Sequence, residues 1–462
     1  MTRMAWRADA SQVLTLAAPL VLTQLAQVAQ GTTSIVMLGQ LDTVDLAAGG
    51  LALSLFNLLR TMGVGLITPT GNLVAEASVD AQGGASRIRA LLCASLALAT
   101  AAGLLAALLM VLGAPLLRGL GQDPRVVERC GQYLTAAAPG LLPLLWFQVL
   151  RQLTVGLGRP GPMLAVTLAS VGLNAVLAYA LMKGAGGLPA LGLSGVAIAG
   201  TVVNALALGA LLWVARRDPG VAPLLSLRNE TSPWPAWRRL ARLGLPVAAS
   251  YGSEAAFFSV LGLLAGAFGP TALAAHTVLN QLVYVVFMVA VGLSQAVSLC
   301  ISRAWAHRDG ARARRLGLTT LGLGWIAMAG VGLLYLAAPL EVLGLLLRPG
   351  SSGEVAAQAA ALLGIAAVLQ CFDCSQNLAI GMLRGVGETA SAFFRTLLGY
   401  WGVGLPLAWW LGWVLQLGLS GLWLGLAGGL ATTAGLLLLR FVKVTAAARH
   451  RSPTALVQGG PA

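Results

Sequence analysis

The sequence has few charged residues for its length. Only 10% of its 462 residues are charged, whereas soluble domains carry about 25%. Hydrophobic residues make up 58% of the chain, more than the core of a soluble protein of this size would bury. The shortage of charge excludes an ordinary soluble domain, and it indicates that lipid and other helices surround most side chains.

Lysine and histidine are also scarce. The chain has two lysines, Lys183 and Lys443, and three histidines, His276, His307 and His450. No two histidines have the spacing of metal ligands, and no G-x-x-x-x-G-K-[ST] loop is present to hold phosphates. We therefore expect no enzyme activity and no bound cofactor. The net charge of +14 lies in short loops between apolar runs, so we expect no nucleic-acid partner either.

What the chain has in abundance is long apolar runs. A membrane-spanning helix needs about 20 predominantly apolar residues. Twelve runs reach about this length, near residues 13–38, 46–75, 91–113, 132–157, 163–182, 191–214, 244–267, 273–302, 316–338, 356–384, 396–414 and 418–440. The 58 glycines suit close packing between membrane helices. The predicted fold class is an all-α polytopic membrane protein with twelve transmembrane helices.

The basic residues are distributed unevenly between the loops. The termini and the even-numbered loops, counted with Arg151 and Arg395 at helix ends, hold 23 Lys and Arg residues, against five in the odd-numbered loops. Cytoplasmic loops of membrane proteins carry the excess of Lys and Arg. We expect both termini to be cytoplasmic.

The second half of the sequence repeats the first at an offset of 227 residues. The repeat pairs residues that are not simply apolar: Pro19 with Pro246, Gly83 with Gly310, and Arg87 with Arg314. Because each repeat holds six helices, an even number, both halves enter the membrane from the same side. We expect two pseudo-symmetric six-helix bundles around a central cavity, an arrangement that permits alternating access.

The repeat also gives the expected domain boundaries. Residues 1–214 form an N-terminal lobe, and residues 244–441 form a C-terminal lobe. The basic segment 215–243 is the expected cytoplasmic linker loop, and residues 442–462 are the expected cytoplasmic tail.

Two acidic residues lie inside predicted membrane helices. Glu254 is in the seventh run and Asp373 is in the tenth, where an acid costs roughly 2.5–3.5 kcal/mol on insertion scales. No basic residue in either helix core neutralises them. A pair of such carboxyl groups binds a proton or a sodium ion on one side of a membrane and releases it on the other. Structural hydrogen bonding between helices is the alternative interpretation.

Uncharged polar residues in the predicted helices form a weaker candidate set. Each is typical of interhelical hydrogen bonding, but together they suggest a hydrated substrate cavity. The set contains Gln27, Gln30, Ser34, Asn174, Thr201, Asn280, Gln281 and Asn377.

Three stretches resemble the multidrug and toxic compound extrusion (MATE) family, in its NorM-like branch. They are Pro19 to Gly39 (PLVLTQLAQVAQGTTSIVMLG), Leu245 to Glu254, and Gln370 to Gly385 (QCFDCSQNLAIGMLRG). The similarity extends from about Ala18 to Phe441. The six-plus-six organisation and the long middle loop agree with it.

The resemblance implies a secondary active transporter in a bacterial inner membrane. Such a protein exports organic, often cationic, compounds in exchange for H⁺ or Na⁺, and a monomer suffices. Glu254 matches the family's glutamate in the seventh helix, and Asp373 matches its aspartate in the tenth. In the family both belong to the cation site of the C-terminal lobe.

The sequence departs from the family at three positions. Ser34 stands where the first helix usually has an aspartate, Ala178 stands at a second polar position although Asn174 is retained, and Leu369 replaces an aromatic residue. The N-terminal cation site therefore lacks its acid. We expect coupling to depend on the C-terminal lobe alone.

Other functions fit the sequence less well. A flippase for a lipid-linked precursor would carry basic residues in its cavity, and only Arg60 lies within a predicted helix. A non-transporting membrane scaffold would not need acids at the membrane midplane, and a channel would conduct without exchange.

Overall fold

Every regular element in the described part of the chain is helical. The computed structural model describes residues 3–80, 83–118, 123–187, 189–226, 234–346 and 353–449. Part of the predicted linker and most of the predicted tail lie outside these residues. The first half contains α1 (Arg3–Leu38), α2 (Thr43–Ile67), α3 (Pro69–Ala77), α4 (Gly84–Arg118), α5 (Pro124–Ala137), η1 (Ala138–Gly140), α6 (Leu141–Gly156), α7 (Gly161–Lys183), η2 (Ala185–Gly187), α8 (Gly192–Arg217) and η3 (Ala222–Leu225). The second half contains α9 (Trp234–Gly266), α10 (Pro270–Ala306), α11 (Gly310–Ala337), α12 (Pro339–Gly344), α13 (Gly353–Gly385), α14 (Thr389–Leu397), η4 (Leu398–Gly404), α15 (Leu405–Trp409), η5 (Trp410–Val414) and α16 (Gly418–Arg449).

These helices confirm the predicted all-α membrane fold. Eleven helices in the described residues are long and apolar enough to cross a membrane. Each corresponds to one predicted run. The twelfth run, 396–414, falls on the consecutive short segments α14, η4, α15 and η5, of which η4 and η5 are π-helical. It is therefore helical throughout, but it is not one regular α-helix.

Prolines divide some of the spans. The second predicted run, 46–75, consists of α2 and α3, which meet at Thr68. Pro69 begins α3, because its ring has no N–H to continue the hydrogen bonding of α2 and is well suited to a first helical turn. Within α1 and α9, by contrast, Pro19 and Pro246 lie inside a continuous helix.

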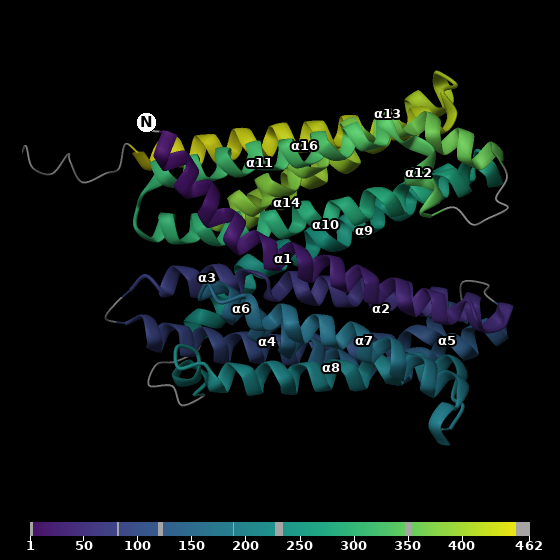
Figure 1. Ribbon diagram of the computed structural model, residues 1–462, viewed down its shortest axis with the longest axis horizontal. Helices are drawn as coiled ribbons and strands as arrows, with labels where there is room; N and C mark the ends of the chain where they lie inside the picture. Colours follow the sequence, from purple (N-terminus) through teal and green to yellow (C-terminus); the bar gives the residue numbers. More distant parts are fainter. Residues whose placement is uncertain are drawn as a thin grey trace, which may run out of the picture. The chain divides into compact units, whose positions relative to one another are not determined.

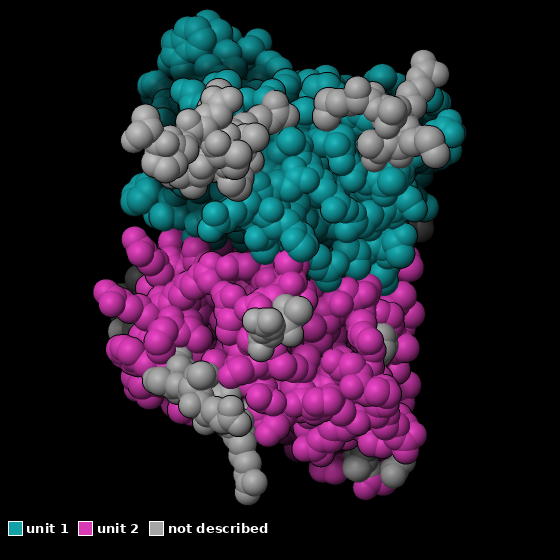
Figure 2. Space-filling model, turned by 90° about the vertical axis from the view of Figure 1, so that its left-hand side faces the viewer, with its two compact units in different colours: residues 1–21, 253–462 teal, residues 22–252 magenta. Residues whose placement is uncertain are grey.

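The chain forms two compact units (Figure 2). Unit 1 contains residues 1–21 and 253–462, and unit 2 contains residues 22–252. The boundaries lie inside α1, after Val21, and inside α9, after Gly252. The lobe and linker boundaries inferred from the repeat stay a prediction.

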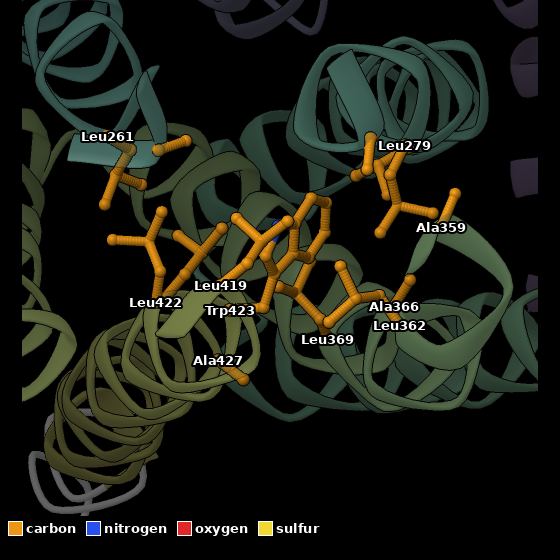
Figure 3. Packing of buried hydrophobic residues seen from close by; sticks show 14 of the residues in the cluster. Leu261, Leu279, Ala359, Leu362, Ala366, Leu369, Leu419, Leu422, Trp423 and Ala427 are labelled. Carbon is orange, nitrogen blue, oxygen red and sulfur yellow. The ribbon is translucent and has the colours of Figure 1, made fainter. Parts of the chain in front are cut away.

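Unit 1 is built on α13, which packs against α10, α11 and α16 (Figure 1). Its apolar core surrounds Trp423 of α16, whose side chain is 1% exposed. Leu279, Leu362 and Leu369 lie around this indole (Figure 3). Burying a large aromatic side chain in this way is a major source of stability. The core fixes the helices on which the acidic residues lie.

Two apolar clusters lie among the described residues of unit 2. One joins α3, α4 and α6 around residues such as Val74, Leu92 and Leu150. The other joins α2, α5 and α8 around Ala48, Leu134 and others. Each cluster is formed by residues at helical spacing on several helices, as expected for a helical bundle.

One turn in each unit has a similar backbone conformation. Gly158 follows α6 and Gly387 follows α13, and both have φ of 81°, a value that glycine adopts without steric cost. The next residue in each turn forms an ion pair within its own unit: Arg159 with Asp218, and Glu388 with Arg440. The charges are reversed between the two turns.

The first of these ion pairs changes the acidity of its carboxyl group. The Arg159 side chain donates a hydrogen bond to Asp218, and the Gly220 N–H donates a second one of 2.8 Å. Both bonds hold the pKa of Asp218 below its usual range, and the bond from Arg159 has the larger effect.

Candidate functional site: an acidic pair in unit 1

Glu254 lies two turns after a proline in α9. Pro246 cannot donate a backbone hydrogen bond within the helix. The Ser250 hydroxyl donates a 2.9 Å hydrogen bond to the carbonyl of Pro246. Glu254 follows one turn later and is half-buried. Glu254 is therefore an acid within a largely apolar segment of α9.

Asp373 lies in the middle of α13 and is 5% exposed. The side-chain amide of Asn377, one turn later, donates 3.1 Å hydrogen bonds to the carboxylate Oδ1 and to the backbone carbonyl of Asp373. Residues four apart share one face of a helix. The carboxylate is therefore held by a neutral donor of its own helix.

The fold brings the two acids into one electrostatic site within unit 1. Glu254 and Asp373 interact with each other, and both interact with Tyr400. The Tyr400 hydroxyl oxygen accepts a hydrogen bond from the side-chain amide of Gln376 in α13. Its ring contacts Phe257 of α9. Tyr400 therefore packs against both helices that carry the acids.

The π-helical segment η4 places two aromatic side chains against α9. Trp401, the residue after Tyr400, donates a 2.9 Å hydrogen bond to the Ser253 hydroxyl. The Tyr400 ring also stacks on Phe257, with 4.7 Å between ring centroids. The wider turn of a π-helix changes the direction of successive side chains, and such turns are frequent at functional sites.

Glycines allow this segment to approach α16 closely. A Cβ added to Gly404 would lie 3.2 Å from the Cα of Gly429, and one added to Gly425 would lie 2.2 Å from the Cα of Ala408. Small residues at such contacts let helix backbones pack against each other. The position of Tyr400 therefore depends on packing against α16.

Neither acid has a basic partner among the described residues. The ion pairs recorded there involve other carboxylates, such as those of Asp9 and Glu388. The donors near Glu254 and Asp373 are a phenol and an amide, which are neutral. Two carboxylates in such surroundings retain a strong attraction for a proton or a small cation. Oxygen ligands of this kind also suit hard metal ions.

The other predicted cavity residues of unit 1 differ in their placement. Asn377 is hydrogen-bonded to Asp373. Asn280 is half-buried and Gln281 is exposed. Within the described residues no hydrogen bond joins either of these two to the acids.

Two of the predicted cavity residues of unit 2 hydrogen-bond to backbone carbonyls. Thr201 donates a 3.1 Å hydrogen bond to the carbonyl of Ala136, and Ser34 donates one of 3.3 Å to the carbonyl of Gln30. Gln27 is half-buried, and Asn174 is 3% exposed. The hydroxyl groups of Ser34 and Thr201 are thus hydrogen-bonded to backbone carbonyls.

Sequence reasoning missed two residues of the site in unit 1 and a buried cation in unit 2. Tyr400 and Gln376 have no exposed surface, and the spacing of Gln376 three residues after Asp373 was the available signal. In unit 2, Arg151 lies inside α6 and is 3% exposed, with hydrogen bonds of 3.0 Å to Gln24 and 3.2 Å to Gln148. The charge pattern places Arg151 with the loop residues, and it does not predict that this side chain is buried.

Comparison with known proteins gives a consistent result. The MatE family model matches residues 19–180 and 246–410. A protein described as a probable multidrug resistance protein NorM from Pseudomonas aeruginosa is 39% identical over 443 residues, which cover 94% of this chain and 89% of that protein. A multidrug resistance protein NorM from Burkholderia vietnamiensis is 36% identical and covers 92% of each chain.

Solved structures show the same fold at lower identity. The crystal structure of the eukaryotic MATE transporter AtDTX14 matches with a TM-score of 0.83 and 21% identity, covering 97% of this chain and 99% of that one. An outward-facing multidrug resistance MATE transporter of the MOP superfamily matches with a TM-score of 0.85 and 18% identity, covering 96% and 97%. The chain therefore belongs to the MATE family of multidrug efflux transporters, and within it to the NorM-like branch.

Proposed function

We propose that this protein is a cation-coupled antiporter that exports organic, often cationic, compounds by alternating access. The coupling ion is H⁺ or Na⁺, and it binds at Glu254 and Asp373. The observation that supports this most directly is the pairing of two acids inside unit 1 without a basic partner in the described residues. Acids in membrane helices are costly and mark ion pathways.

The energetics of such an exchange are adequate. One elementary charge that crosses 100 mV yields about 2.3 kcal/mol. This exceeds the free energy of one decade of concentration gradient, about 1.4 kcal/mol. A cationic substrate leaves the cell against the same field, so its export needs more than one coupling ion or a chemical gradient of the ion.

The N-terminal lobe has a different role in this proposal. Ser34 replaces the acid that the family usually has in its first helix, and its hydroxyl is bonded to the carbonyl of Gln30. The polar side chains at Asn174 and Thr201 then contribute to the substrate path. Ion coupling depends on the acids of unit 1.

The proposed setting is a bacterial inner membrane, in which a monomer works with both termini in the cytoplasm. The excess of basic residues in the even-numbered loops supports this orientation. Single cysteines at two exposed positions of a cysteine-free variant test it, one at Ala85 and one at Ala190. The cysteine at Ala85 should react with an impermeant thiol reagent only in inverted vesicles, and the cysteine at Ala190 only in intact cells. The reverse pattern would contradict the orientation.

Transport in proteoliposomes tests the main proposal. Efflux of a fluorescent organic cation is measured with an inward gradient of Na⁺ or of H⁺ imposed separately. One of the two gradients should drive efflux, and both Glu254→Gln and Asp373→Asn should abolish the gradient-driven part. Glu354→Gln, an exposed acid at the start of the same helix α13, is the matched control and should transport normally. Full gradient-driven efflux in Glu254→Gln and Asp373→Asn would contradict the proposal.

A further inference from the structure

The end of α8 and the start of α9 combine arginine with tryptophan at one membrane surface. α8 is a candidate membrane span that ends at Arg217, and α9 is one that begins at Trp234. Because residues 218–233 join these consecutive spans, both helix ends lie on the same side of the membrane. Tryptophan is enriched at the depth of the lipid headgroups, and an arginine at the end of a span extends its guanidinium group toward them.

The last turn of α8 exposes one indole and two guanidinium groups. Trp213, Arg216 and Arg217 are all exposed, and their spacing of three and four residues places them on one helix face. The guanidinium carbon of Arg217 lies 3.8 Å from the centroid of the Trp213 ring, which is a cation–π contact. This contact holds the cation in place on an exposed surface.

The first turns of α9 have a second face of the same kind. Trp234, Arg238 and Arg242 are four residues apart from one to the next, and all three are exposed. The Trp234 ring stacks on that of Trp237, with 5.0 Å between the ring centroids. Leu240, by contrast, is fully buried. α9 therefore begins as an amphipathic helix whose exposed face is basic and aromatic.

One apolar cluster of unit 2 holds both helix ends. Leu211 and Ala215 of α8 belong to this cluster, and so do Leu224 of η3 and Leu240 of α9. Trp237 also packs against it. The two exposed faces therefore lie on the outside of a common core. Together they form the basic surface of unit 2: Trp213, Arg216, Arg217, Trp234, Arg238 and Arg242.

The positive charge of the basic surface is not balanced by neighbouring acids. Within the described ranges, no ion pair is recorded for any of its four arginines. In the connection 218–233, Asp218 is already paired with Arg159, and the remaining charged residues are Arg228 and Glu230, whose charges cancel. The surface is therefore complementary to an anion.

We propose that the basic surface of unit 2 binds the phosphate headgroup of an anionic phospholipid. Guanidinium groups bind phosphate through pairs of N–H donors, and the indoles lie at the depth of the headgroups. Arginines clustered next to a membrane span attract anionic lipid, each raising the affinity about fivefold. The proposed orientation of the chain places the surface in the cytoplasmic leaflet. This lipid site is separate from the proposed coupling role of Glu254.

Thermal unfolding in detergent micelles tests the proposal. The Tm of the purified protein is measured with rising mole fractions of phosphatidylglycerol, and with phosphatidylcholine of the same acyl chains. Phosphatidylglycerol should raise the Tm more, because a ligand of the folded state stabilises it. Arg238→Gln/Arg242→Gln should raise the half-saturating mole fraction about 25-fold. Arg238→Lys/Arg242→Lys, which keeps both charges, should retain most of the binding.

The same unit provides a matched control. Arg125 and Arg129 of α5 are also exposed and four residues apart, but Arg129 has an acidic partner, Asp45, at 3.5 Å. Arg125→Gln/Arg129→Gln removes the same charge and should leave the response to phosphatidylglycerol unchanged. Arg216→Gln/Arg217→Gln tests the basic surface from the other helix, and it should weaken binding to a similar extent. It serves if the variant in α9 does not fold.

Three results would overturn the proposal. Equal stabilisation by phosphatidylcholine would show that the charge of the headgroup has no part in binding. Equal stabilisation by inorganic phosphate would show that the surface binds a free anion and not a lipid. An equal loss of the response in Arg125→Gln/Arg129→Gln would assign the effect to the net charge of the protein.

Discussion

The close contact between α15 and α16 predicts a strong effect of one methyl group. A Cβ added to Gly425 would lie 2.2 Å from the Cα and N of Ala408. Both are backbone atoms, so rotation of a side chain does not relieve the overlap. Gly425→Ala should therefore push α15 away from α16, and with it the adjoining segment that holds Tyr400.

The magnitude follows from two opposing contributions. Replacing glycine by alanine inside a helix gains about 1 kcal/mol, whereas overpacking a filled site costs about 1–3 kcal/mol. At Gly435, on the same helix, a Cβ would meet nothing within 4 Å, so Gly435→Ala should show the gain alone. Because both variants share the gain, they should differ by the overpacking cost, about 1–3 kcal/mol, with Gly425→Ala the less stable.

Thermal unfolding of the purified protein in detergent measures this difference. For a unit of about 150–250 residues, 1 kcal/mol corresponds to about 2–4 °C in Tm. Gly425→Ala should therefore unfold roughly 2–12 °C below Gly435→Ala. Equal Tm values for the two variants would show that the helices do not approach each other in this way.

Three further variants test other features of the structure. Trp423→Phe should cost less stability than Trp423→Ala, which should cost about 3–5 kcal/mol, because Phe leaves the smaller cavity and the indole Nε1 has no hydrogen-bond partner in the described residues. Ser253→Ala and Trp401→Phe each remove the same hydrogen bond, so a double-mutant cycle on Tm should give a coupling energy of about 1 kcal/mol. Asp218→Asn should lower Tm slightly at neutral pH. Because Arg159 keeps the pKa of Asp218 low in the folded state, this difference should disappear as the pH falls through that pKa.

Each of these predictions has a clear contrary result. Equal losses in the two Trp423 variants would show that its N–H is bonded. Additive effects of Ser253→Ala and Trp401→Phe would show that the two side chains do not interact. If Asp218→Asn still unfolds at a lower Tm than the wild type in acid, the substitution acts through packing and not through the loss of a charge.

Most of the fold could be predicted from the sequence because the membrane imposes a simple requirement. Backbone groups in lipid must be paired within the chain, so each long apolar run becomes a helix. The exceptions have local or tertiary causes. The start of α3 follows from Pro69, which a reader of the sequence can see. The π-helical segment η4 depends on contacts of Gly399 and Gly404 with α16, which the sequence does not reveal.

The site could be predicted only in part, for a similar reason. Glu254 and Asp373 are conspicuous because an acid is rare in an apolar run, and the structure brings them together. Tyr400 is one of six tyrosines, and nothing in its neighbourhood along the chain indicates its contacts with Gln376 of α13 and Phe257 of α9. These contacts join helices that are distant in the sequence. The assignment of coupling to these residues remains a prediction.

The most direct test of the account compares one residue from each unit in the same transport assay. Ion-driven efflux of an organic cation is measured in proteoliposomes for Glu254→Gln and for Ser34→Ala. We expect Glu254→Gln to lose the dependence on the ion gradient and Ser34→Ala to keep it. Loss of coupling in Ser34→Ala together with normal coupling in Glu254→Gln would place the ion site in the other unit and contradict the account.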